Sequence, residues 1–240
     1  MKVQVYIPSR MASTRLPNKP LKDIAGLPMV CHVWNRAKEA NVGDVFVACD
    51  DTRIAEAVQA HGGNAIMTDS ELPSGSDRIW QAVQRQIEAG GEKPDIIINV
   101  QGDEPLLPPE LLTEAVEAFE LGWPDVVTFA HEIHKEAEIN DTGMVKVVTS
   151  TQGKAHYFSR HPIPHGSEIK KRHIGFYAYK YAALEKFVSS KPSPLEELEK
   201  LEQLRGLDLG LNYYVAMTEK APVGVDTPED LELARRLMAE

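Results

Sequence analysis

The chain of 240 residues has only two cysteines, Cys31 and Cys49. Both lie inside apolar runs and neither has a partner at the spacing of a metal-binding pair, so a cysteine-based metal site is excluded. We expect both to be small buried hydrophobic residues in a protein of a reducing compartment.

Long apolar segments and an excess of positive charge are also missing. No segment approaches the roughly 20 apolar residues of a membrane-spanning helix, and Gln4 interrupts the first apolar run too early for a signal-peptide core. The formal net charge is −10, with 26 Lys and Arg against 36 Asp and Glu. Binding to nucleic acid or to an anionic membrane surface requires a basic face. We therefore expect a cytoplasmic, soluble protein that binds neither nucleic acid nor membrane.

Several familiar catalytic and nucleotide-binding motifs are absent. The sequence contains no G-x-x-x-x-G-K-[ST] phosphate loop and no G-x-G-x-x-G dinucleotide fingerprint. It also lacks a G-x-S-x-G nucleophile elbow and the Asp-x-Asp pair of many nucleotide-sugar glycosyltransferases. These absences weaken the case for kinases, dehydrogenases and hydrolases of the common types.

Short apolar runs alternate with segments of helical period along the chain. This pattern predicts an α/β protein with a mostly parallel sheet covered on both faces by helices. At this length we expect one domain, residues 1–240. A segment at about 157–181 breaks the alternation with a loop and then a strand, and we expect it to project from the sheet as a lid or an oligomer contact. The predicted strands are 3–7, 44–48, 64–67, 95–100, 125–130, 145–148, 173–179 and 212–217.

The clearest helix signals lie near the end of the sequence. Ser193 and Pro194 predict the start of a helix that continues to about residue 206, with a leucine at positions 195, 198, 201 and 204. Pro228, directly after Thr227, predicts the start of a final helix. Its inward-facing residues are expected to be Leu231, Ala234 and Leu237.

The first strand leads into a loop that carries three cations and no Asp or Glu. We call residues 10–19 the cation loop, and its cations are Arg10, Arg15 and Lys19. Pro17 and Pro20 restrict the backbone, so part of the ordering entropy is removed before a ligand binds. A solvated basic turn is the plain alternative. The position directly after the first strand favours a site for a small, multiply charged anion.

Carboxylates occupy two comparable places. Asp103 follows an apolar run in IIINVQGDEP, and Asp226 precedes the last helix in APVGVDTPED. Ligands of open α/β sheets bind at the carboxyl ends of strands, and Mg²⁺ usually accepts only one or two protein carboxylates. The plain alternatives are a turn former for Asp103 and a helix-start charge for Asp226. Their occurrence together with the cation loop favours phosphoryl transfer, which needs positioned cations and a held metal.

Two other segments have more than one interpretation. In PSGSDRI, Ser76 or Asp77 caps a helix that begins near Ile79, which is the favoured interpretation, or the segment contacts a bound nucleotide. An aromatic strand such as RHIGFYAY is more often packing than a ligand site. Glu202 borders the apolar stripe of its predicted helix. Its default interpretation is a residue on the solvated face of that helix.

Seven segments of the chain carry a family resemblance. They are IPSRMASTRLPNKPL, SGSDR, NVQGDEP, YFSR, RHIGFYAY, PSPLEELEKLEQLR and GVDTPEDL. In this order they resemble the 3-deoxy-manno-octulosonate cytidylyltransferases, the CMP-KDO synthetases. The opening pattern R-x-x-S-x-R-x-P-x-K-P is shared in looser form with CMP-sialic acid synthetases, so the ordered set, which covers essentially the whole chain, carries the resemblance.

The resemblance implies a Rossmann-like fold of the nucleotide-diphospho-sugar transferase type. It also implies a reaction in which CTP and the eight-carbon acid sugar 3-deoxy-D-manno-octulosonate give the CMP-sugar and pyrophosphate, for lipopolysaccharide biosynthesis. In that family the anomeric hydroxyl of the sugar attacks the α-phosphorus directly, with Mg²⁺ and without a covalent enzyme intermediate. A homodimer is implied as well, with the segment at 157–181 at or near the contact.

Carried over by position, the family's roles fall on residues along the whole chain. The expected catalytic residues are Arg10, Lys19 and Asp103. The expected nucleotide-binding residues are Arg10, Lys19, Ser76, Arg78 and Gln101, and the expected metal ligands are Asp103 and Asp226. The expected sugar-binding residues are Arg160, His173, Tyr177, Glu202 and Gln203, with Arg160 on the sugar carboxylate. Arg15 is expected to brace the loop.

Departures from the family pattern leave the identity of the sugar substrate open. Ser9, Asn18 and Ser76 stand where Ala, Gly and Thr are common, and we expect these changes to be tolerated. The link between Ile163 and His173 is longer in several members and borders the sugar pocket. The alternative substrates are therefore the 8-amino analogue of the same sugar or a sialic-type acid sugar. A non-catalytic nucleotide-binding regulator is the alternative of a different class.

Overall fold

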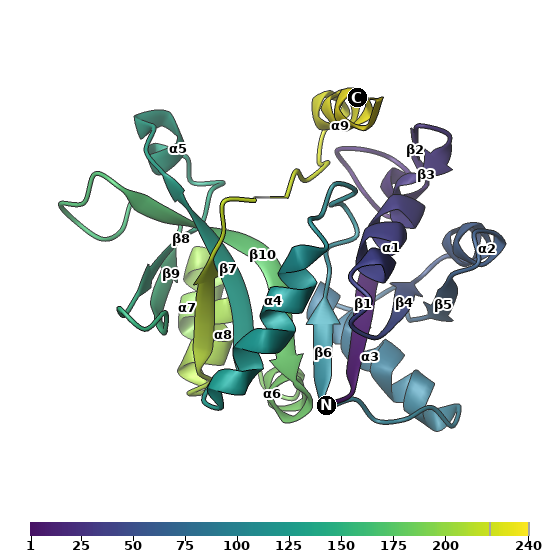
Figure 1. Cartoon of the computed structure of the whole chain (residues 1–240), viewed down its shortest axis with the longest axis horizontal. Coiled ribbons are helices and arrows are strands. Elements are labelled where there is room, and N and C mark those ends of the chain that lie inside the picture. The colour runs from purple at the N-terminus through teal and green to yellow at the C-terminus, as the bar shows by residue number, and fades with distance from the viewer. Residues whose placement is uncertain (221, 240) are drawn as a thin grey trace. The chain divides into compact units, whose positions relative to one another are not determined.

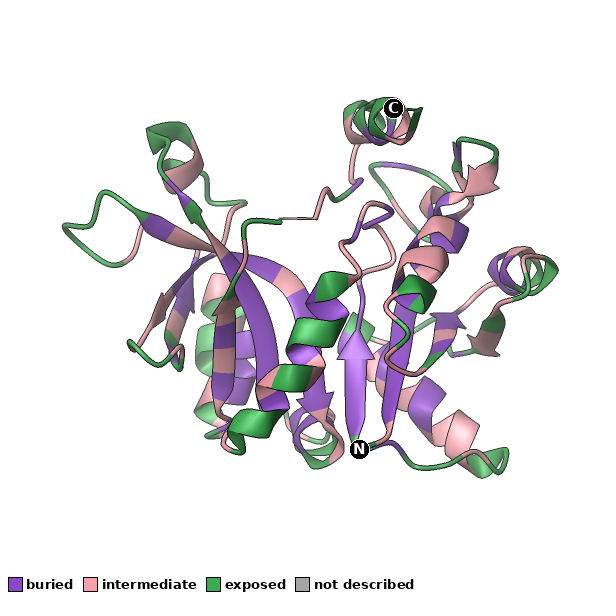
Figure 2. Cartoon of the chain, in the orientation of Figure 1, coloured by how far each residue is buried: buried purple, intermediate pink, exposed green. Residues whose placement is uncertain are grey.

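The computed structural model describes residues 1–220 and 222–239, which form two compact units. The first unit contains Met1–Thr113 and Pro222–Glu240, and the second contains Glu114–Ala221. Figure 1 labels most elements of both, and Figure 2 shows that their strands are mostly buried while exposed residues gather on helices and loops. The expectation of one domain over residues 1–240 stays a prediction.

The first unit is built on a parallel sheet with the order β6-β1-β4-β5. Its strands are β1 (Val3–Ser9), β4 (Asp44–Cys49), β5 (Asn64–Met67) and β6 (Ile96–Asn99). All of β6 and most of β1 are buried, as expected for strands covered on both faces. In register, Ser9 lies beside Cys49, and Cys49 beside Met67. The residues that follow these three strands therefore begin at one edge of the sheet.

Helices of the first unit pack on this sheet. Helices α1 and α3 contact β1 and β4, and α2 contacts β4 and β5. The helical elements are η1 (Lys19–Leu21), α1 (Met29–Glu39), α2 (Thr52–Ala60), α3 (Gly75–Glu88), α4 (Glu110–Ala118), which continues into the second unit, and α9 (Pro228–Ala239). The short strands β2 (Asp23–Ile24) and β3 (Leu27–Pro28) form a small hairpin that the sequence did not indicate.

The last helix joins the cation loop to the core. In α9, Leu231 and Ala234 are buried in a cluster with Leu16 of the cation loop. The expectation that Leu237 faces inward is wrong, because its side chain is 41% exposed. Met238 packs against the cluster instead, since it follows Leu231 by seven residues and so lies on the same face of the helix.

The second unit has a mixed sheet around β7 (Val126–Ile133). Strand β11 (Tyr213–Met217) pairs with β7 in parallel, and β10 (Lys170–Lys180) pairs with it antiparallel. An antiparallel pair, β8 (Lys146–Thr149) and β9 (Ala155–Ser159), joins β10 where Lys146 meets Arg172. The other elements are η2 (Phe119–Leu121), α5 (Glu136–Asn140), α6 (Tyr181–Val188), α7 (Pro194–Glu199) and α8 (Gln203–Asp208). The predicted mostly parallel sheet flanked by helices is confirmed.

The segment predicted to project, 157–181, is only partly a loop. Its first residues complete β9, and its second half is β10, which is paired with β7 from Lys170 to Tyr179. Residues 160–169 form the loop between these strands. The strand half therefore belongs to the sheet of the second unit, and the role of the loop as a lid or an oligomer contact stays a prediction.

The predicted helix over about 194–206 is broken in two. Helix α7 ends at Glu199, and Lys200 adopts the left-handed conformation with φ of 56°. Helix α8 begins at Gln203. The leucine stripe therefore does not share one face: Leu198 is 79% exposed, whereas Leu201 is 5% exposed.

None of the helices within residues 1–220 and 222–239 has the length and apolarity needed to cross a membrane.

Candidate active site

A cavity of about 450 Å³ opens in the first unit, beside the ends of β1 and β6. Six of the predicted site residues line it: Arg10, Lys19, Arg78, Gln101, Asp103 and Asp226, the last from the connection to α9. The cation loop, the segment after β6 and the segment before α9 therefore converge as the sequence predicted.

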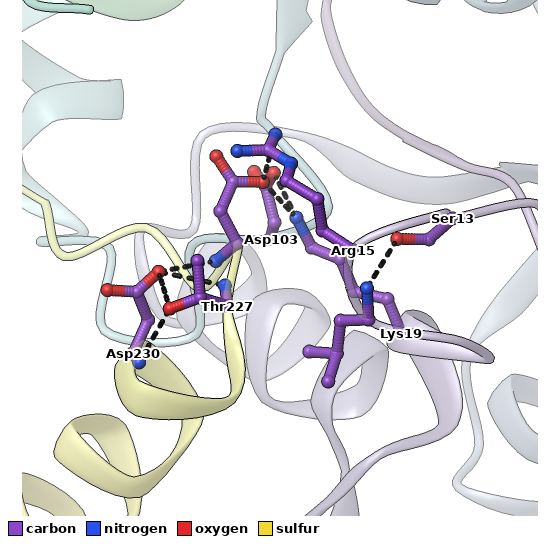
Figure 3. A network of polar contacts seen from close by, with 8 residues as sticks. Ser13, Arg15, Lys19, Asp103, Thr227 and Asp230 are labelled. Atoms are coloured by element: carbon purple, nitrogen blue, oxygen red, sulfur yellow. Dashed lines mark hydrogen bonds and ion pairs between the residues drawn. The ribbon is translucent and has the colours of Figure 1, made fainter.

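Lys19 lies between the two predicted metal carboxylates. Figure 3 labels Lys19 and Asp103 in this network of polar contacts. Its ammonium donates to Asp103 Oδ2 at 2.7 Å and to Asp226 Oδ1 at 2.8 Å. The lysine side chain is 13% exposed, while Asp103 and Asp226 are 35% and 48% exposed. One cation thus neutralises part of a doubly negative site, and both carboxylates remain accessible from the cavity.

Local backbone structure brings these three residues together. Lys19 begins η1 directly after Asn18, whose φ of 55° turns the chain. The N–H of Val225 donates to the Asp103 carbonyl at 2.8 Å, so the segments that carry the two carboxylates are tied by their backbones. The N–H of Asp226 itself donates to Asp230 Oδ2 at 3.0 Å.

Asp230 caps α9 and leaves Asp226 to face the cavity. Its Oδ2 also accepts from the Thr227 N–H and the Thr227 hydroxyl, each at 2.9 Å, and the Asp230 N–H donates to that hydroxyl at 3.2 Å. Burial opposes ionisation of Asp230, but hydrogen bonds from Asp226 and Thr227 outweigh it and lower its pKa. The helix-start role expected as an alternative for Asp226 is filled by Thr227 and Asp230.

The two accessible carboxylates suit a hard divalent cation. Their oxygens already share one cation, the Lys19 ammonium, so both can face a single point. Within the described part of the chain no three His, Cys, Asp or Glu side chains gather as a metal site. A pair of carboxylates completed by water and phosphate oxygens is the usual arrangement for Mg²⁺. Asp103 and Asp226 therefore have the chemistry of a divalent-cation site.

The two arginines of the cation loop differ in their contacts. Arg10 is exposed on the cavity wall. Arg15 Nη2 lies 3.1 Å from Asp226 Oδ1, and its side chain is 66% exposed. Arg15 thus shares a carboxylate with Lys19, which agrees with its expected bracing role.

The amino end of α3 forms part of the cavity wall. Ser74 and Gly75 line the cavity, and Ser74 caps the helix by accepting from the Asp77 N–H at 3.2 Å. The expectation that Ser76 or Asp77 caps this helix is wrong, because the helix starts one residue before Ser76. Ser76 is fully buried and does not line the cavity. Its predicted nucleotide-binding role stays a prediction.

Arg78 and Gln101 reach the cavity from different elements. Arg78 is only 3% exposed, and its guanidinium donates to the Thr68 hydroxyl at 2.6 Å and to Asp50 Oδ2 at 3.3 Å. Gln101 follows β6, and its amide donates to Asn99 Oδ1 at 3.4 Å. The next residue, Gly102, is required to lack a side chain, because a Cβ there would lie 2.6 Å from the Pro8 carbonyl oxygen.

In the second unit, Arg160 is anchored by backbone carbonyls. Its guanidinium donates from Nε to the Glu199 carbonyl at 2.8 Å, from Nη1 to that of Thr142 at 2.9 Å, and from Nη2 to that of Lys200 at 3.2 Å. The Glu199 carboxylate in turn accepts from the Arg160 N–H at 3.0 Å and the Ser159 hydroxyl at 2.8 Å. Arg160 therefore stabilises the carboxyl end of α7, a structural role that the sequence did not indicate.

His173 is buried as a neutral ring. Its Nε2 lies 2.9 Å from the Thr128 hydroxyl, whose own proton goes to the Phe176 carbonyl at 2.7 Å. The hydroxyl also lies 3.2 Å from the Ile174 carbonyl, and because its single proton goes to a carbonyl, the arrangement favours His173 Nε2 as the donor to Thr128. Burial lowers the pKa of His173 to about 3. Neutral His173 is therefore the Nε2–H tautomer, with Nδ1 as an acceptor.

A bulge in β10 brings Tyr177 next to His173. Ile174 pairs with Phe129 and Tyr177 with Thr128, so two residues of β10 have no counterpart on β7. The rings of His173 and Tyr177 are 5.4 Å apart. Burial, followed by the negative charge of Glu202, raises the pKa of Tyr177 well above its usual value.

The remaining predicted sugar residues lie at the start of α8. Glu202 is the residue before the helix, and Gln203 is its first residue and 4% exposed. The charge of Glu202 raises the pKa values of both Tyr177 and Tyr213, after the larger effect of burial. His173, Tyr177 and Glu202 thus form one neighbourhood within the second unit, while Arg160 is held at the end of α7.

Comparison with known proteins decides the family. A family model described as cytidylyltransferase matches residues 5–217. The 3-deoxy-manno-octulosonate cytidylyltransferase of Rhodospirillum rubrum is 50% identical over 241 residues, which cover 98% of this chain and 94% of that protein. The chain belongs to this family. The protein of the same name from Bradyrhizobium sp. strain BTAi1 is 49% identical and covers 100% of this chain and 98% of its own length.

Solved structures agree with the membership of this chain in the cytidylyltransferase family. The structure of CMP:2-keto-3-deoxy-manno-octonic acid synthetase in complex with CTP matches with a TM-score of 0.92 and 41% identity, covering 100% of this chain and 99% of that one. A cytidylyltransferase from Leptospira borgpetersenii matches with a TM-score of 0.66 and 19% identity, covering 100% of this chain and 87% of that one. The second likeness shows the fold alone.

Two residues of this cytidylyltransferase near the cavity were missed by the sequence reasoning. Asp50 follows β4 and contacts both the cation loop and Arg78. The rule that singled out Asp103, a carboxylate just past a strand, applies equally to Asp50 and could have found it. Ser9 lines the cavity with a buried hydroxyl that has no hydrogen-bond partner among the described residues. The sequence signal that could have identified Ser9 is that Ala is common at this position in the family.

Proposed function

We propose that this enzyme transfers the cytidylyl group of CTP to 3-deoxy-D-manno-octulosonate, giving the CMP-sugar and pyrophosphate. The observation that carries the proposal is the convergence of Lys19, Asp103 and Asp226 on a cavity that Arg10 also lines. A site with accessible cations and a pair of accessible carboxylates suits a triphosphate that brings its own divalent metal. Membership of the family supplies the substrate class.

In the proposed reaction, the anomeric oxygen of the sugar bonds to the α-phosphorus as the bond from that phosphorus to the pyrophosphate oxygen breaks. Arg10 and Lys19 bind the triphosphate and stabilise the charge that moves onto pyrophosphate. Asp103 and Asp226 would hold Mg²⁺, which would supply Lewis-acid polarisation of the phosphoryl group. No described residue is assigned as a general base, and the hydroxyl proton is transferred to solvent.

Lys19 has a second task before the nucleotide binds. Two carboxylates that face one point repel each other, and the ammonium between them offsets this repulsion. We infer that Lys19 keeps Asp103 and Asp226 in place in the free enzyme. Its ammonium also lines the cavity, where it would donate to the triphosphate.

We propose that the acid sugar is bound by His173, Tyr177, Glu202 and Gln203. A neutral imidazole with Nδ1 as an acceptor and a protonated phenol are groups that hydrogen-bond sugar hydroxyls without binding a competing anion. Arg160 remains a candidate for the sugar carboxylate. All three of its guanidinium nitrogens already donate to carbonyls, so only the second N–H of each Nη is available.

The test is a substrate panel with CTP and Mg²⁺, in which pyrophosphate release is measured. We expect the highest kcat/KM with 3-deoxy-D-manno-octulosonate, and a preference for its 8-amino analogue or for a nine-carbon acid sugar would contradict the proposal. The same assay without added Mg²⁺ and with excess chelator should show no turnover.

The Asp103→Asn variant tests the metal assignment. It should lose at least about 100-fold in kcat and keep its fold, because a neutral amide cannot replace the carboxylate as a ligand. Asp95→Asn is the matched control: Asp95 lies before β6, where it accepts from the Lys2 N–H at 2.6 Å, far along the strand from the cavity end. Unchanged turnover of Asp103→Asn would remove the metal role.

We also propose a cytoplasmic homodimer that acts in lipopolysaccharide biosynthesis. These assignments rest on the family alone. Sedimentation velocity at micromolar concentration should give the mass of a dimer, and a monomer under those conditions would count against it.

A further inference from the structure

We propose that Asp50 is a positioning residue for nucleotide binding: it fixes the start of the cation loop through the Met11 N–H and so holds Arg10 at the cavity. Asp50 Oδ1 accepts from the Met11 N–H at 2.9 Å, and Oδ2 lies 3.3 Å from Arg78 Nη2. The inference rests on the proposed binding of CTP at this cavity. It adds a residue that lies outside the predicted catalytic and binding sets.

The parallel sheet makes this contact possible. Ser9, the last residue of β1, is in register with Cys49, the last residue of β4. The next residues, Arg10 and Asp50, therefore leave the same edge of the sheet, and the Asp50 side chain reaches across to the first peptide of the cation loop. This link is formed by a buried group, because the Asp50 side chain is 8% exposed.

Asp50 is held in turn by Arg78. The Arg78 guanidinium donates to the Thr68 hydroxyl at 2.6 Å, and that hydroxyl donates to the Cys49 carbonyl at 3.0 Å. Arg78 also donates to the Asp69 carbonyl at 3.3 Å. A buried carboxylate needs such a counter-ion, since an unpaired buried charge is strongly destabilising. Both oxygens of Asp50 are therefore committed, one to α3 and the other to the loop.

Arg10 depends on this backbone contact for its direction. Its side chain is exposed and makes no hydrogen bond or ion pair with another residue in the part of the chain that the structure describes. The peptide between Arg10 and Met11 supplies the N–H that Asp50 binds, so Asp50 fixes the backbone from which the Arg10 side chain extends. Removing the acceptor would let this peptide turn and would raise the entropic cost of placing Arg10 on a phosphate.

The test compares Asp50→Ala with Asp50→Asn by calorimetric titration with CTP and Mg²⁺ and by steady-state kinetics. Asp50→Ala should weaken CTP binding about tenfold, while the KM for the acid sugar changes less than about twofold. Asp50→Asn should recover most of the CTP affinity, because its amide oxygen can still accept from Met11. Asp51→Asn is the control, since Asp51 caps α2 and pairs with Arg53 rather than with the loop.

The possible outcomes distinguish a failure of this inference from a failure of the proposed function. CTP affinity of Asp50→Ala equal to that of the unmodified enzyme would overturn the inference, and so would a parallel loss for both substrates that tracks a fall in Tm. A protein that binds CTP but releases no pyrophosphate with any acid sugar would overturn the proposed function, while the CTP titrations would still test Asp50.

A second measurement covers the case in which Asp50→Ala does not fold. Hydrogen exchange at the Met11 amide of the unmodified protein should be slow without nucleotide, since the N–H is bonded to a buried carboxylate. Exchange as fast as that of an unprotected loop amide would overturn the inference. The Asp50→Asn variant should keep this protection.

Discussion

At the scale of single residues, Lys19 is the most constrained cation of the site. Its ammonium contacts two carboxylates at 2.7 and 2.8 Å, and its side chain is largely shielded from solvent. Arg15 contacts one of the same carboxylates at 3.1 Å from a mostly exposed position. Exposed ion pairs contribute little because water and salt screen them, whereas partly buried ones are screened less.

This difference predicts unequal effects of removing the two cations. Lys19→Ala should lower kcat/KM for CTP by about 100-fold, because it removes the proposed donor to the triphosphate and leaves Asp103 and Asp226 facing each other. Arg15→Ala should lower it by less than about tenfold, since its contact is exposed. Initial-rate measurements over a range of CTP concentrations will check this ranking, and equal losses would contradict it.

Single residues also show what could be predicted from the sequence. The strand-end rule located Asp103, and a Pro after Thr227 located Asp226 beside the last helix, because both signals are local in the chain. The cap of α3 was assigned to Ser76 or Asp77, but Ser74 provides it. In the sequence S-G-S-D, several residues can cap, and the choice depends on where the backbone enters the helix.

At the scale of elements, the break between α7 and α8 depends on contacts far apart in the sequence. The leucine spacing fits one continuous helix, and no Gly or Pro interrupts it between Leu195 and Arg205. The chain nevertheless turns at Lys200, where Arg160 donates to the carbonyls of Glu199 and Lys200. A helix end needs partners for its last carbonyls, and here they come from a residue about 40 positions earlier, so helical periodicity alone could not locate the break.

The contacts of Arg160 at the break between α7 and α8 predict that replacing this residue lowers the stability of the protein. Arg160→Met should lower the free energy of unfolding by about 2 kcal/mol, because carbonyls at the end of α7 lose their donors. Lys186→Met is a matched control, since exposed Lys186 donates to a single carbonyl, that of Leu209 at the end of α8. Urea unfolding will measure both variants.

The kinetics of the same variant separate two roles for Arg160. A rise in the KM for the acid sugar with an unchanged free energy of unfolding would assign Arg160 to the substrate rather than to α7. Loss of stability together with a raised KM would indicate that α7 and the proposed sugar-binding residues depend on each other.

The bulge of β10 is another element that the sequence does not indicate. RHIGFYAY shows an aromatic strand, and alternation would place His173 and Tyr177 on one face. In the structure two extra residues separate their pairing positions, and the Thr128 hydroxyl bonds a carbonyl within the bulge. The partner that stabilises the bulge lies on β7, so the bulge was not predictable from β10 itself.

At the scale of the whole molecule, the fold class followed from the sequence more securely than any site residue did. Alternating apolar runs and helical stripes specify buried strands and covering helices, and each predicted strand is present with ends within a few residues. Short elements without such a pattern, including β2, β3 and β9, were not predicted. Binding residues depend on the positions where these elements end, which is where sequence patterns are weakest.

The stability of the folded protein should depend on pH through His173. Its pKa in the folded state is about 3, below the value of about 6.5 for an unfolded histidine, so the unfolded chain binds the proton more readily. The stability gained by keeping the ring neutral is complete above about pH 6.5 and is lost as the pH falls toward 3, by up to about 1.4 kcal/mol per pH unit. Carboxylates with lowered pKa values, such as Asp230, add losses only at the acid end of this range.

His173→Gln isolates that contribution, because the Gln amide can still donate to the Thr128 hydroxyl but does not titrate. Between pH 7 and pH 5, we expect the free energy of unfolding to fall by about 2 kcal/mol more in the unmodified protein than in His173→Gln, although the variant starts lower from lost ring packing. His161→Gln, at an exposed histidine, should follow the unmodified protein. Urea titrations at each pH give these values. Parallel curves for the unmodified protein and His173→Gln would mean that the folded protein accepts the proton at His173 without cost, and the buried neutral tautomer would then be wrong.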